Sequence, residues 1–243
     1  MSYYIGLSIL SNNPDCQCRR DRKEILRAEA RHILSRLADR PFAEDAIATD
    51  GQGRPFFRKE TSALPCSGGR FPCDIDFSIS HSGSLAAVSV VKGAGIRTGC
   101  DVELVRPRVR AGKIAEQFFS AAERDYIFFQ GCFDETKFYE IWTLKECYIK
   151  LRGLSVFDMP AVPSFIRDGN FAFSAAGAAP LSFCLYELGG SGEHYVLAAA
   201  IEGAEAEQPE IRWFSPAASQ KGGEAAAVLA GDRWAAPGLI AQF

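Results

Sequence analysis

Two carboxylates alternate with apolar residues in the short stretch Gly-Cys-Asp-Val-Glu-Leu-Val at residues 99–105. Successive side chains of a β-strand point to opposite faces, so a strand here aims Asp101 and Glu103 at one face, with Val102 and Leu104 on the other. Two like charges side by side are costly unless a cation lies between them. The stretch therefore predicts either a strand with one solvated face or a pair of carboxylates that holds a cation.

The composition is that of a folded globular protein. The chain has 243 residues, 47% of them hydrophobic, which is enough to bury the core of one large domain or two small ones. The net charge of −3 argues against a globally basic nucleic-acid binder but allows a local basic patch. The apolar start is expected to be a strand rather than a signal peptide, because a basic n-region is missing. No apolar run reaches the length of a membrane span. The eight scattered cysteines indicate reduced thiols and a cytoplasmic protein.

The hydrophobic periodicity predicts an α+β fold. A basic amphipathic helix is expected at residues 19–40, and a Gly-, Pro- and Ser-rich loop at 51–72. A capping box, Ser120 with Glu123, is expected to start another helix. Strands are expected at residues 1–10, on both sides of a Gly-Ser turn within 74–91, and at 95–105, 171–175, 181–188 and 194–202.

A helix at residues 135–152, ending at Gly153, is the most informative element. At helical spacing one stripe is apolar and is expected to face the core: Ile141, Leu144, Tyr148 and Leu151. A second face combines an aromatic ring, a carboxylate and two ammonium groups: Trp142, Lys145, Glu146, Ile149 and Lys150. Taken alone, Glu146 and Lys150 at positions i and i+4 are compatible with an ordinary surface ion pair, worth about 0.3–0.5 kcal/mol.

A serine–histidine–serine sequence lies where a predicted strand meets its turn. Taken alone, His81 is compatible with a turn residue bonded to nearby backbone, but with Ser80 and Ser82 it also offers donors that suit phosphate oxygens. Basic residues elsewhere, Arg54 and those of the helix at 19–40, could serve the same ligand or only maintain solubility.

Three motifs in order resemble those of the 4′-phosphopantetheinyl transferases, in particular the surfactin-synthetase-activator type. They are Ser80-His81, the Gly-x-Asp-x-Glu strand at 99–103, and the Trp-x-x-Lys-Glu-x-x-x-Lys helix segment at 142–150. The motifs span about residues 50 to 155, and the order of elements looks similar from about residue 3 to 215. Each motif alone is weak, and the three together are specific.

The resemblance implies a pseudo-dimer of two similar α/β halves with the active site in the cleft between them. The halves would be residues 1–98 and 99–216, followed by an Ala- and Gly-rich peripheral tail at 217–243. It further implies that Asp101, Glu103 and Glu146 hold Mg²⁺, whose preference for oxygen ligands agrees with three carboxylates. The implied reaction is Mg-dependent transfer of the phosphopantetheine arm of coenzyme A to a serine of an apo acyl or peptidyl carrier protein, with release of 3′,5′-ADP.

The resemblance also assigns roles to single residues. Glu146 would bind the metal, directly or through water, and help deprotonate the serine, while Lys150 would stabilise the leaving group. Trp142 would buttress the site, and Arg27 is a rival of Arg31 for the 3′-phosphate. The expected coenzyme A contacts are Arg31, Gly53, Arg54, Pro55, Ser80, His81, Lys145 and Lys150. Arg54 stands where the family has Lys, which keeps the charge but changes the geometry.

Other classes of function fit less well. A serine hydrolase is disfavoured because the Ser-His-Ser-Gly-Ser stretch is not a nucleophile elbow. A nucleic-acid binder would explain only the basic helix, and we expect neither nucleic acid nor membrane as partner. The alternative to the transferase is a relative that binds coenzyme A or a carrier protein without transfer.

The basic stretch at residues 106–113 is a candidate docking site for an acidic carrier helix, or an ordinary solvated loop. A monomer is expected, since a pseudo-dimer completes its site within one chain.

Overall fold

The structure is a computed structural model that describes residues 2–9, 19–38, 42, 46–51, 54–57, 75–173, 180–190, 192–204, 208–214 and 238–242. The helices are α1 (Arg19–Ala38), α2 (Ala111–Phe118), α3 (Ala121–Ile127), α4 (Glu135–Arg152) and the 3₁₀ helix η1 (Val156–Ala161). The first strands are β1 (Ser2–Ile9), β2 (Ile47–Thr49), β3 (Pro55–Phe57), β4 (Ile75–Ser82), β5 (Leu85–Lys92) and β6 (Arg97–Leu104). They are followed by β7 (Phe128–Phe129), β8 (Cys132–Phe133), β9 (Ile166–Arg167), β10 (Asn170–Phe171), β11 (Leu181–Gly190), β12 (Glu193–Glu202), β13 (Glu210–Phe214) and β14 (Gly238–Gln242). Among the described residues, no helix is both long and apolar enough to cross a bilayer.

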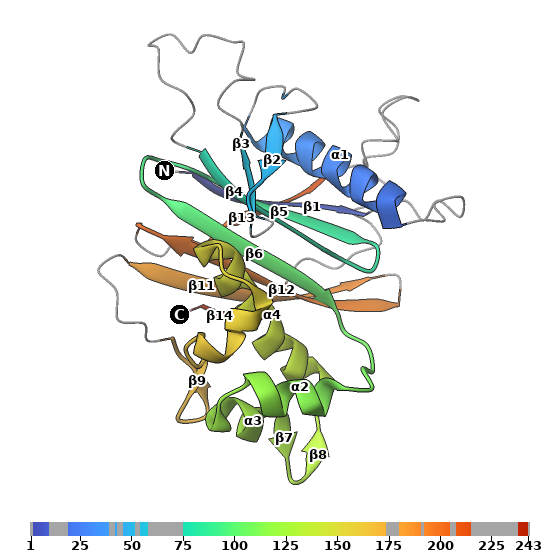
Figure 1. Cartoon of the computed structure of the whole chain (residues 1–243), viewed down its shortest axis with the longest axis vertical. Helices are drawn as coiled ribbons and strands as arrows, with labels where there is room; N and C mark the ends of the chain where they lie inside the picture. Colours follow the sequence, from blue (N-terminus) through green and yellow to red (C-terminus); the bar gives the residue numbers. More distant parts are fainter. Residues whose placement is uncertain are drawn as a thin grey trace.

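Two four-stranded sheets form the centre of the molecule. The first has the order β13-β1-β5-β4 and the second the order β14-β11-β12-β6. Helix α1 packs on β1 and β5, and α4 packs on β6 and β12. Figure 1 shows α1 along the first sheet and α4 across the second. The expected α+β class is confirmed, and the layers follow from helices and sheets that each bury an apolar face.

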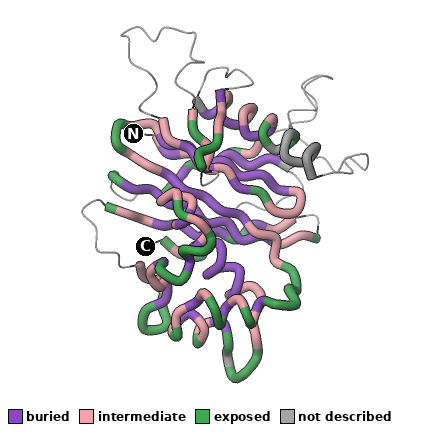
Figure 2. The backbone as a smooth tube through the Cα atoms, in the orientation of Figure 1, coloured by how far each residue is buried: buried purple, intermediate pink, exposed green. Residues whose placement is uncertain are grey.

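The second sheet is buried on both faces, which explains why β12 is almost continuously apolar. Val196 and Ala198 belong to the core shared with α4, whereas Leu197 and Ala199 belong to the core shared with the first sheet. Alternate residues of a strand point to opposite faces, so a strand between two layers needs apolar residues at every position. Figure 2 shows buried residues through the strands of both sheets and along α4.

The two sheets meet at β4 and β6, the strands at one edge of each sheet order. Side chains of β4 accept hydrogen bonds from the backbone of β6 in place of a backbone ladder. Thr98, Val102 and Leu104 donate their N–H groups to the side chains of Asp76, Ser80 and Ser82, at distances of 2.8, 3.2 and 3.0 Å, respectively. We call this contact the β4–β6 seam. It satisfies backbone donors that an unpaired edge would leave open.

Most of the predicted elements are present. The first strand, the two strands around the Gly-Ser turn and the strand with the alternating carboxylates are β1, β4, β5 and β6. Ser120 and Glu123 form both hydrogen bonds of the predicted capping box at the start of α3. Gly153 ends α4 in the left-handed region, at φ 65°, where glycine carries no steric penalty.

Three sequence expectations look different in space. The expected loop at 51–72 contains β3, which pairs with β2, and the expected tail contains β14, which pairs with β11. Of the strand expected at 171–175, β10 contains only Phe171 of that range, and residues 174–175 lie outside the described part. Strand β13 comes after β12 in the chain, yet it pairs with β1 of the first sheet. The predicted boundary between the two halves, at residues 98 and 99, falls within β6. The division into halves stays a prediction.

Helix α4 lies very close to β6 because Gly99 has no side chain. A Cβ atom at Gly99 would lie 2.6 Å from the carbonyl oxygen of Cys147 and 2.9 Å from the Cβ of Leu151. Both neighbours belong to the helix, so the close approach fixes how deeply α4 packs. Glycine in a strand interior often marks such an approach of two backbones.

We expect Gly99→Ala to lower the free energy of unfolding by about 1–3 kcal/mol, because α4 must move away from β6. Gly112→Ala in α2 is the matched control, since its Cβ would meet nothing within 4 Å. The control should be neutral or stabilising by up to about 1 kcal/mol. Urea unfolding measures both variants, and equal stability of Gly99→Ala and the wild type would contradict the packing described here.

Candidate functional site

A cavity of about 380 Å³ lies between strands of the first sheet and helix α4. Arg54 and Pro55 of the β3 region and Ser78 and Ile79 of β4 line it from one side. The opposite side consists of residues of α4 and of the segment that follows it: Glu146, Ile149, Lys150, Gly153, Leu154, Ser155 and Val156. Polar and charged groups thus converge on a partly apolar hollow, which is the usual composition of a small-molecule site.

Asp101 lies at the centre of a hydrogen-bond network beside this cavity. Its Oδ1 accepts hydrogen bonds from Ser80 Oγ at 2.7 Å and from Lys150 Nζ at 2.6 Å. Lys150 Nζ also donates to Ser80 Oγ at 2.7 Å. The other carboxylate oxygen, Oδ2, is buried and accepts no hydrogen bond from the described residues. A buried carboxylate oxygen without a donor is costly, so this atom is suited to a bound cation.

Glu103 is fixed by two donors from different elements. Its Oε2 accepts a hydrogen bond from Ser82 Oγ at 2.8 Å, and its Oε1 accepts one from the indole Nε1 of Trp142 at 3.2 Å. The guanidinium of Arg108 lies over the Trp142 ring, 5.3 Å from its centroid. The expectation that Trp142 buttresses the site therefore has a direct physical basis, because its indole orients one carboxylate.

The third carboxylate, Glu146, comes from α4 and lines the cavity. Burial together with the charges of Asp101 and Glu103 raises the pKa of Glu146 to about 7, although Lys150 opposes the shift. Burial and Asp101 likewise raise the pKa of Glu103. Burial disfavours the charge of Lys150, yet its ion pair with Asp101 keeps the pKa of this lysine above the ordinary value. The three carboxylates thus repel one another electrostatically, as expected where a cation would be bound.

The carboxylate oxygens of Asp101, Glu103 and Glu146 are compatible ligands for a hard divalent cation such as Mg²⁺. It prefers a few carboxylate oxygens completed by water and phosphate oxygens, and Asp101 Oδ2 is open to it. In the described part of the chain, no three carboxylate, histidine or cysteine side chains converge as a preformed metal site. The cation that contacts Asp101 in this structure is the ammonium of Lys150.

Arg54 connects the two walls of the cavity. Its guanidinium donates to the carbonyl oxygen of Leu151, at the end of α4, at 2.6 Å, and to both oxygens of Asp76 at 2.8 and 3.0 Å. Asp76 also accepts from the N–H of Thr98 in the β4–β6 seam. A planar guanidinium can make all these bonds at once, which a lysine cannot.

Comparisons with known proteins agree with this site. Residues 97–200, which contain β6, α4 and most of β12, match the model of the 4′-phosphopantetheinyl transferase superfamily. In this region the chain is similar to the 4′-phosphopantetheinyl transferases. The matched region contains all three carboxylates together with Trp142 and Lys150.

Three bacterial relatives of the superfamily show the extent of the likeness. The chain is 32% identical over 127 residues to the 4′-phosphopantetheinyl transferase psf-1 of Bacillus pumilus, covering 52% of this chain and 47% of psf-1. It is 32% identical over 149 residues to AcpT of Escherichia coli O157:H7, covering 60% of this chain and 65% of AcpT. It is 36% identical over 100 residues to gsp of Aneurinibacillus migulanus, covering 40% and 38%. The matches thus span between about two fifths and two thirds of the relatives, and the resemblance inferred from the motifs is confirmed.

The structure brings most of the residues expected from the superfamily to one place. Arg54, Pro55, Glu146 and Lys150 line the cavity. Ser80 and Asp101 are hydrogen-bonded to Lys150. Glu103 is held by Ser82 and Trp142, and its charge contributes to the raised pKa of Glu146. His81 is exposed at the end of β4. Gly53 lies outside the described residues.

Two residues that were expected to contact coenzyme A do not line this cavity. Lys145 does not line the cavity: its side chain is 1% exposed, and its ammonium lies 3.1 Å from the carboxylate of Glu123, which is completely buried. The prediction that Lys145 shares a ligand-binding face with Glu146 is wrong, because α4 is buried almost all round. The Lys145 side chain points toward Glu123 of α3 rather than to the cavity. Arg31 belongs to α1, which packs on β1 and β5, and is not among the residues lining the cavity.

Ser82 and Asp76 have roles at the site that the sequence did not predict. Ser82 orients Glu103, and Asp76 holds both Arg54 and the backbone of β6. The sequence does carry a signal for them, since Asp76, Ser78, Ser80 and Ser82 alternate with apolar residues or His81 along one strand. When the polar face of a strand points into the interior, its side chains need hydrogen-bond partners there.

Lys145→Met tests the structural role of this lysine. We expect the free energy of unfolding to fall by about 3–5 kcal/mol, because Glu123 would keep a buried charge without its partner. The dissociation constant of coenzyme A for the folded variant should not change. Lys137→Met on the same helix is the control, since its ammonium lies 4.9 Å from the centroid of the Tyr126 ring and away from Glu123. Weaker coenzyme A binding at unchanged stability would instead return Lys145 to the ligand site.

Glu146→Gln should stabilise the protein without metal above neutral pH. A pKa raised from 4.5 to about 7 means that folding opposes ionisation of Glu146, so its charge costs stability as the pH rises from about 4.5 through 7. At about 1.4 kcal/mol per pKa unit, the variant should gain on the order of 3 kcal/mol at pH 8 and almost nothing at pH 4.5. Urea unfolding in EDTA across this range measures the difference, and a pH-independent difference would refute the assignment.

Proposed function

We propose that this chain transfers the 4′-phosphopantetheine arm of coenzyme A to a serine of an apo acyl or peptidyl carrier protein. The observation that carries the proposal is the ion pair of Asp101 with Lys150 beside a cavity that Glu146 and Lys150 line, where the charges of Asp101 and Glu103 help to raise the pKa of Glu146. The relatives named above are phosphopantetheinyl transferases, which supports the same reaction class. The residues alone support phosphoryl chemistry with a divalent cation, and the similarity to these transferases supports phosphopantetheine as the transferred group.

Asp101, Glu103 and Glu146 would hold Mg²⁺, with Glu146 binding directly or through water. When bound, the metal supplies charge neutralisation to the pyrophosphate of coenzyme A. Ser80 and Ser82 keep the carboxylates of Asp101 and Glu103 in place through their hydroxyl groups. Trp142 restricts Glu103 from the side of α4.

Bond formation and cleavage occur at the phosphorus that carries pantetheine. The carrier serine oxygen forms a bond to this phosphorus, and the bond from phosphorus to the bridging pyrophosphate oxygen breaks, so 3′,5′-ADP leaves with the electron pair. The serine proton passes to Glu146, directly or through water. Lys150 is one helical turn away and places a positive charge beside the leaving group.

The proposal includes a pseudo-dimeric arrangement of two α/β halves with the site in the cleft between them. One wall of the cavity belongs to β4 and to the start of β3, and the other belongs to α4 and the segment after it, which supports a site between halves. A single chain supplies both walls, so we expect the protein to act as a monomer.

Intact-protein mass spectrometry tests the activity. Several apo carrier proteins are incubated with this protein, coenzyme A and Mg²⁺, and a parallel sample contains EDTA. We expect a mass gain of one phosphopantetheine arm that is lost in EDTA, and release of 3′,5′-ADP. Coenzyme A binding without a mass gain on any carrier would favour the alternative, a binding relative that transfers nothing.

Glu146→Gln provides the sharpest variant in the same assay. Turnover should fall at least about a hundredfold, because the base is lost. The affinity for coenzyme A should stay within a few-fold of the wild type, since most of the cavity is unchanged. Unchanged turnover would refute the role assigned to Glu146.

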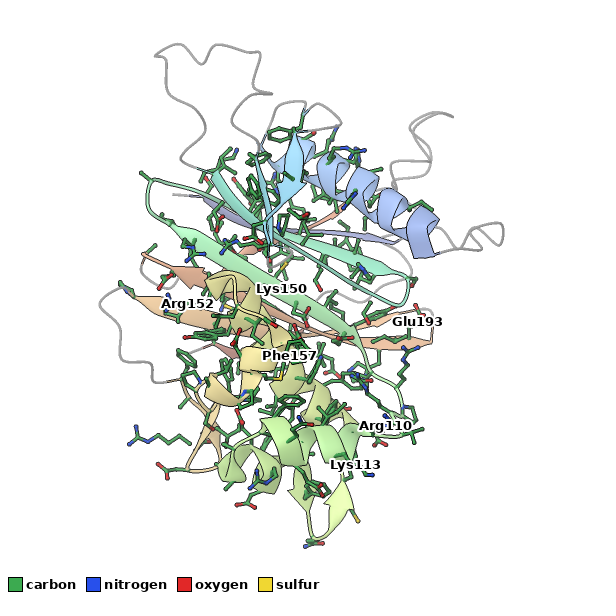
Figure 3. All side chains as sticks on the ribbon, in the orientation of Figure 1. Arg110, Lys113, Lys150, Arg152, Phe157 and Glu193 are labelled. Atoms are coloured by element: carbon green, nitrogen blue, oxygen red, sulfur yellow. The ribbon has the colours of Figure 1, made fainter. Side chains whose placement is uncertain are left out.

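The carrier is proposed to dock on the basic surface that follows β6. Arg108, Arg110 and Lys113 line a second hollow together with Ile114, and Val109 is fully exposed between the arginines. Figure 3 shows Arg110 and Lys113 together at the start of α2. A cationic rim with an exposed apolar side chain fits an acidic helix of a carrier protein by charge complementarity. The segment at 106–113 therefore stays a proposed docking site.

Charge reversal at Arg110 and Lys113 should raise the KM for the carrier by about tenfold and change the KM for coenzyme A by less than about twofold. Arg108 is left unchanged in this test because it packs over Trp142. Arg167→Glu serves as control, since Arg167 is exposed on β9. Equal effects on the two KM values, or none, would rule out carrier docking on this surface.

A further inference from the structure

We propose that Tyr195 and Glu193 are positioning residues that clamp the β4–β5 turn and so hold Ser80, His81 and Ser82 at the site. The inference rests on the proposed function, since those three residues serve coenzyme A and the metal carboxylates there. Both clamp residues stand at the start of β12 in the second sheet, whereas the turn belongs to the first. In Figure 3, Glu193 lies at the end of the sheet where the β4–β5 turn is found.

The clamp consists of a compact set of hydrogen bonds around Ser84. The N–H of Ser84 donates to the hydroxyl oxygen of Tyr195 at 3.1 Å, and Ser84 Oγ donates to Glu193 Oε2 at 2.7 Å. The Tyr195 hydroxyl donates to the same carboxylate oxygen at 3.0 Å. Tyr195 is completely buried, so its ring cannot turn away without opening the core between the sheets.

Gly83 shows how closely the turn fits onto this clamp. Its φ of 54° lies in the left-handed region, and a Cβ there would be 2.6 Å from the Tyr195 hydroxyl and 3.0 Å from Cδ2 of Leu104. The glycine of the Ser-His-Ser-Gly sequence is thus required by the turn and by the approach of Tyr195. This contact gives the motif a structural reason that is separate from any ligand.

The clamp can act on the site because the turn directly follows the residues that matter. Ser82 precedes Gly83 and orients Glu103, and Ser80 orients Asp101. Strand β4 is the last strand of its sheet order, and the end of an edge strand opens more easily than the interior of a sheet. The hydrogen bonds that Tyr195 and Glu193 of the second sheet form with Ser84 therefore limit how far Ser82 and His81 can move from the carboxylates.

Tyr195→Phe tests the clamp, because it removes one hydroxyl and leaves the ring in the core. The matched control is Tyr186→Phe, the same change at a buried tyrosine of β11 in the same core. Three quantities are measured on the full chain: amide hydrogen exchange of residues 82–85, the dissociation constant of coenzyme A, and the KM values for coenzyme A and carrier.

For Tyr195→Phe we expect exchange in the turn and the dissociation constant of coenzyme A to rise by about three- to tenfold, the net effect of losing the hydroxyl that bonds Ser84 and Glu193. The KM for coenzyme A should follow, the KM for the carrier should stay near the wild-type value, and the control should change none of these. Glu193→Gln keeps an acceptor oxygen and should lose less affinity than Glu193→Ala.

Two results would overturn the clamp. In the first, Tyr195→Phe behaves like the control in both exchange and affinity. In the second, the turn opens but coenzyme A binds as tightly as to the wild type, which would make the contact structural only. A wild type that binds coenzyme A without transferring the arm refutes the proposed activity alone, since exchange and affinity still test the clamp. A wild type that binds no coenzyme A refutes both.

Discussion

The β4–β6 seam is the contact on which the arrangement of the molecule depends. Two edge strands that belong to different sheets approach each other, and hydroxyl and carboxylate side chains of one accept the backbone N–H groups of the other. A direct backbone ladder would have merged the sheets into one, whereas side chains keep them distinct and still satisfy buried donors. The same serine oxygens donate to Asp101 and Glu103, so the bonds that join the sheets also orient the carboxylates.

Helix α4 combines the functions of core and site because it is surrounded on nearly every side. Of its 18 residues, most between Phe138 and Leu151 are buried, and Glu146 and Lys150 are exceptions that face the cavity. Its close packing on Gly99 sets the distance between the helix carboxylate and the strand carboxylates. The buried pair of Lys145 and Glu123 then fixes the rotation of the helix against α3. Depth and rotation are thus determined by residues outside the cavity.

Local patterns predicted the elements well, and they predicted the motif residues that converge at the site. Some signals depend only on neighbouring residues and can be recognised in the sequence alone. They include the capping at Ser120, the glycine that ends α4 and the alternation along β6. Spatial neighbours were harder to predict. Helical spacing placed Lys145 beside Glu146, but a counter-charge from α3 decides where its ammonium lies. Likewise, nothing near Ser84 in the sequence reveals that Tyr195 and Glu193 contact it from 109 to 111 positions away.

The β4–β6 seam and the site share the hydroxyl oxygens of Ser80 and Ser82. A ligand that binds one wall of the cavity therefore also affects the position of the other wall. The carboxylates stand on the second sheet and on α4, whereas their serine donors and Arg54 belong to β4 and the β3 region. A nucleotide that draws these walls together and a cation that fixes the carboxylates favour the same relative placement of the sheets. Their binding free energies are then coupled, and thermodynamic linkage requires that each raise the affinity for the other by the same factor.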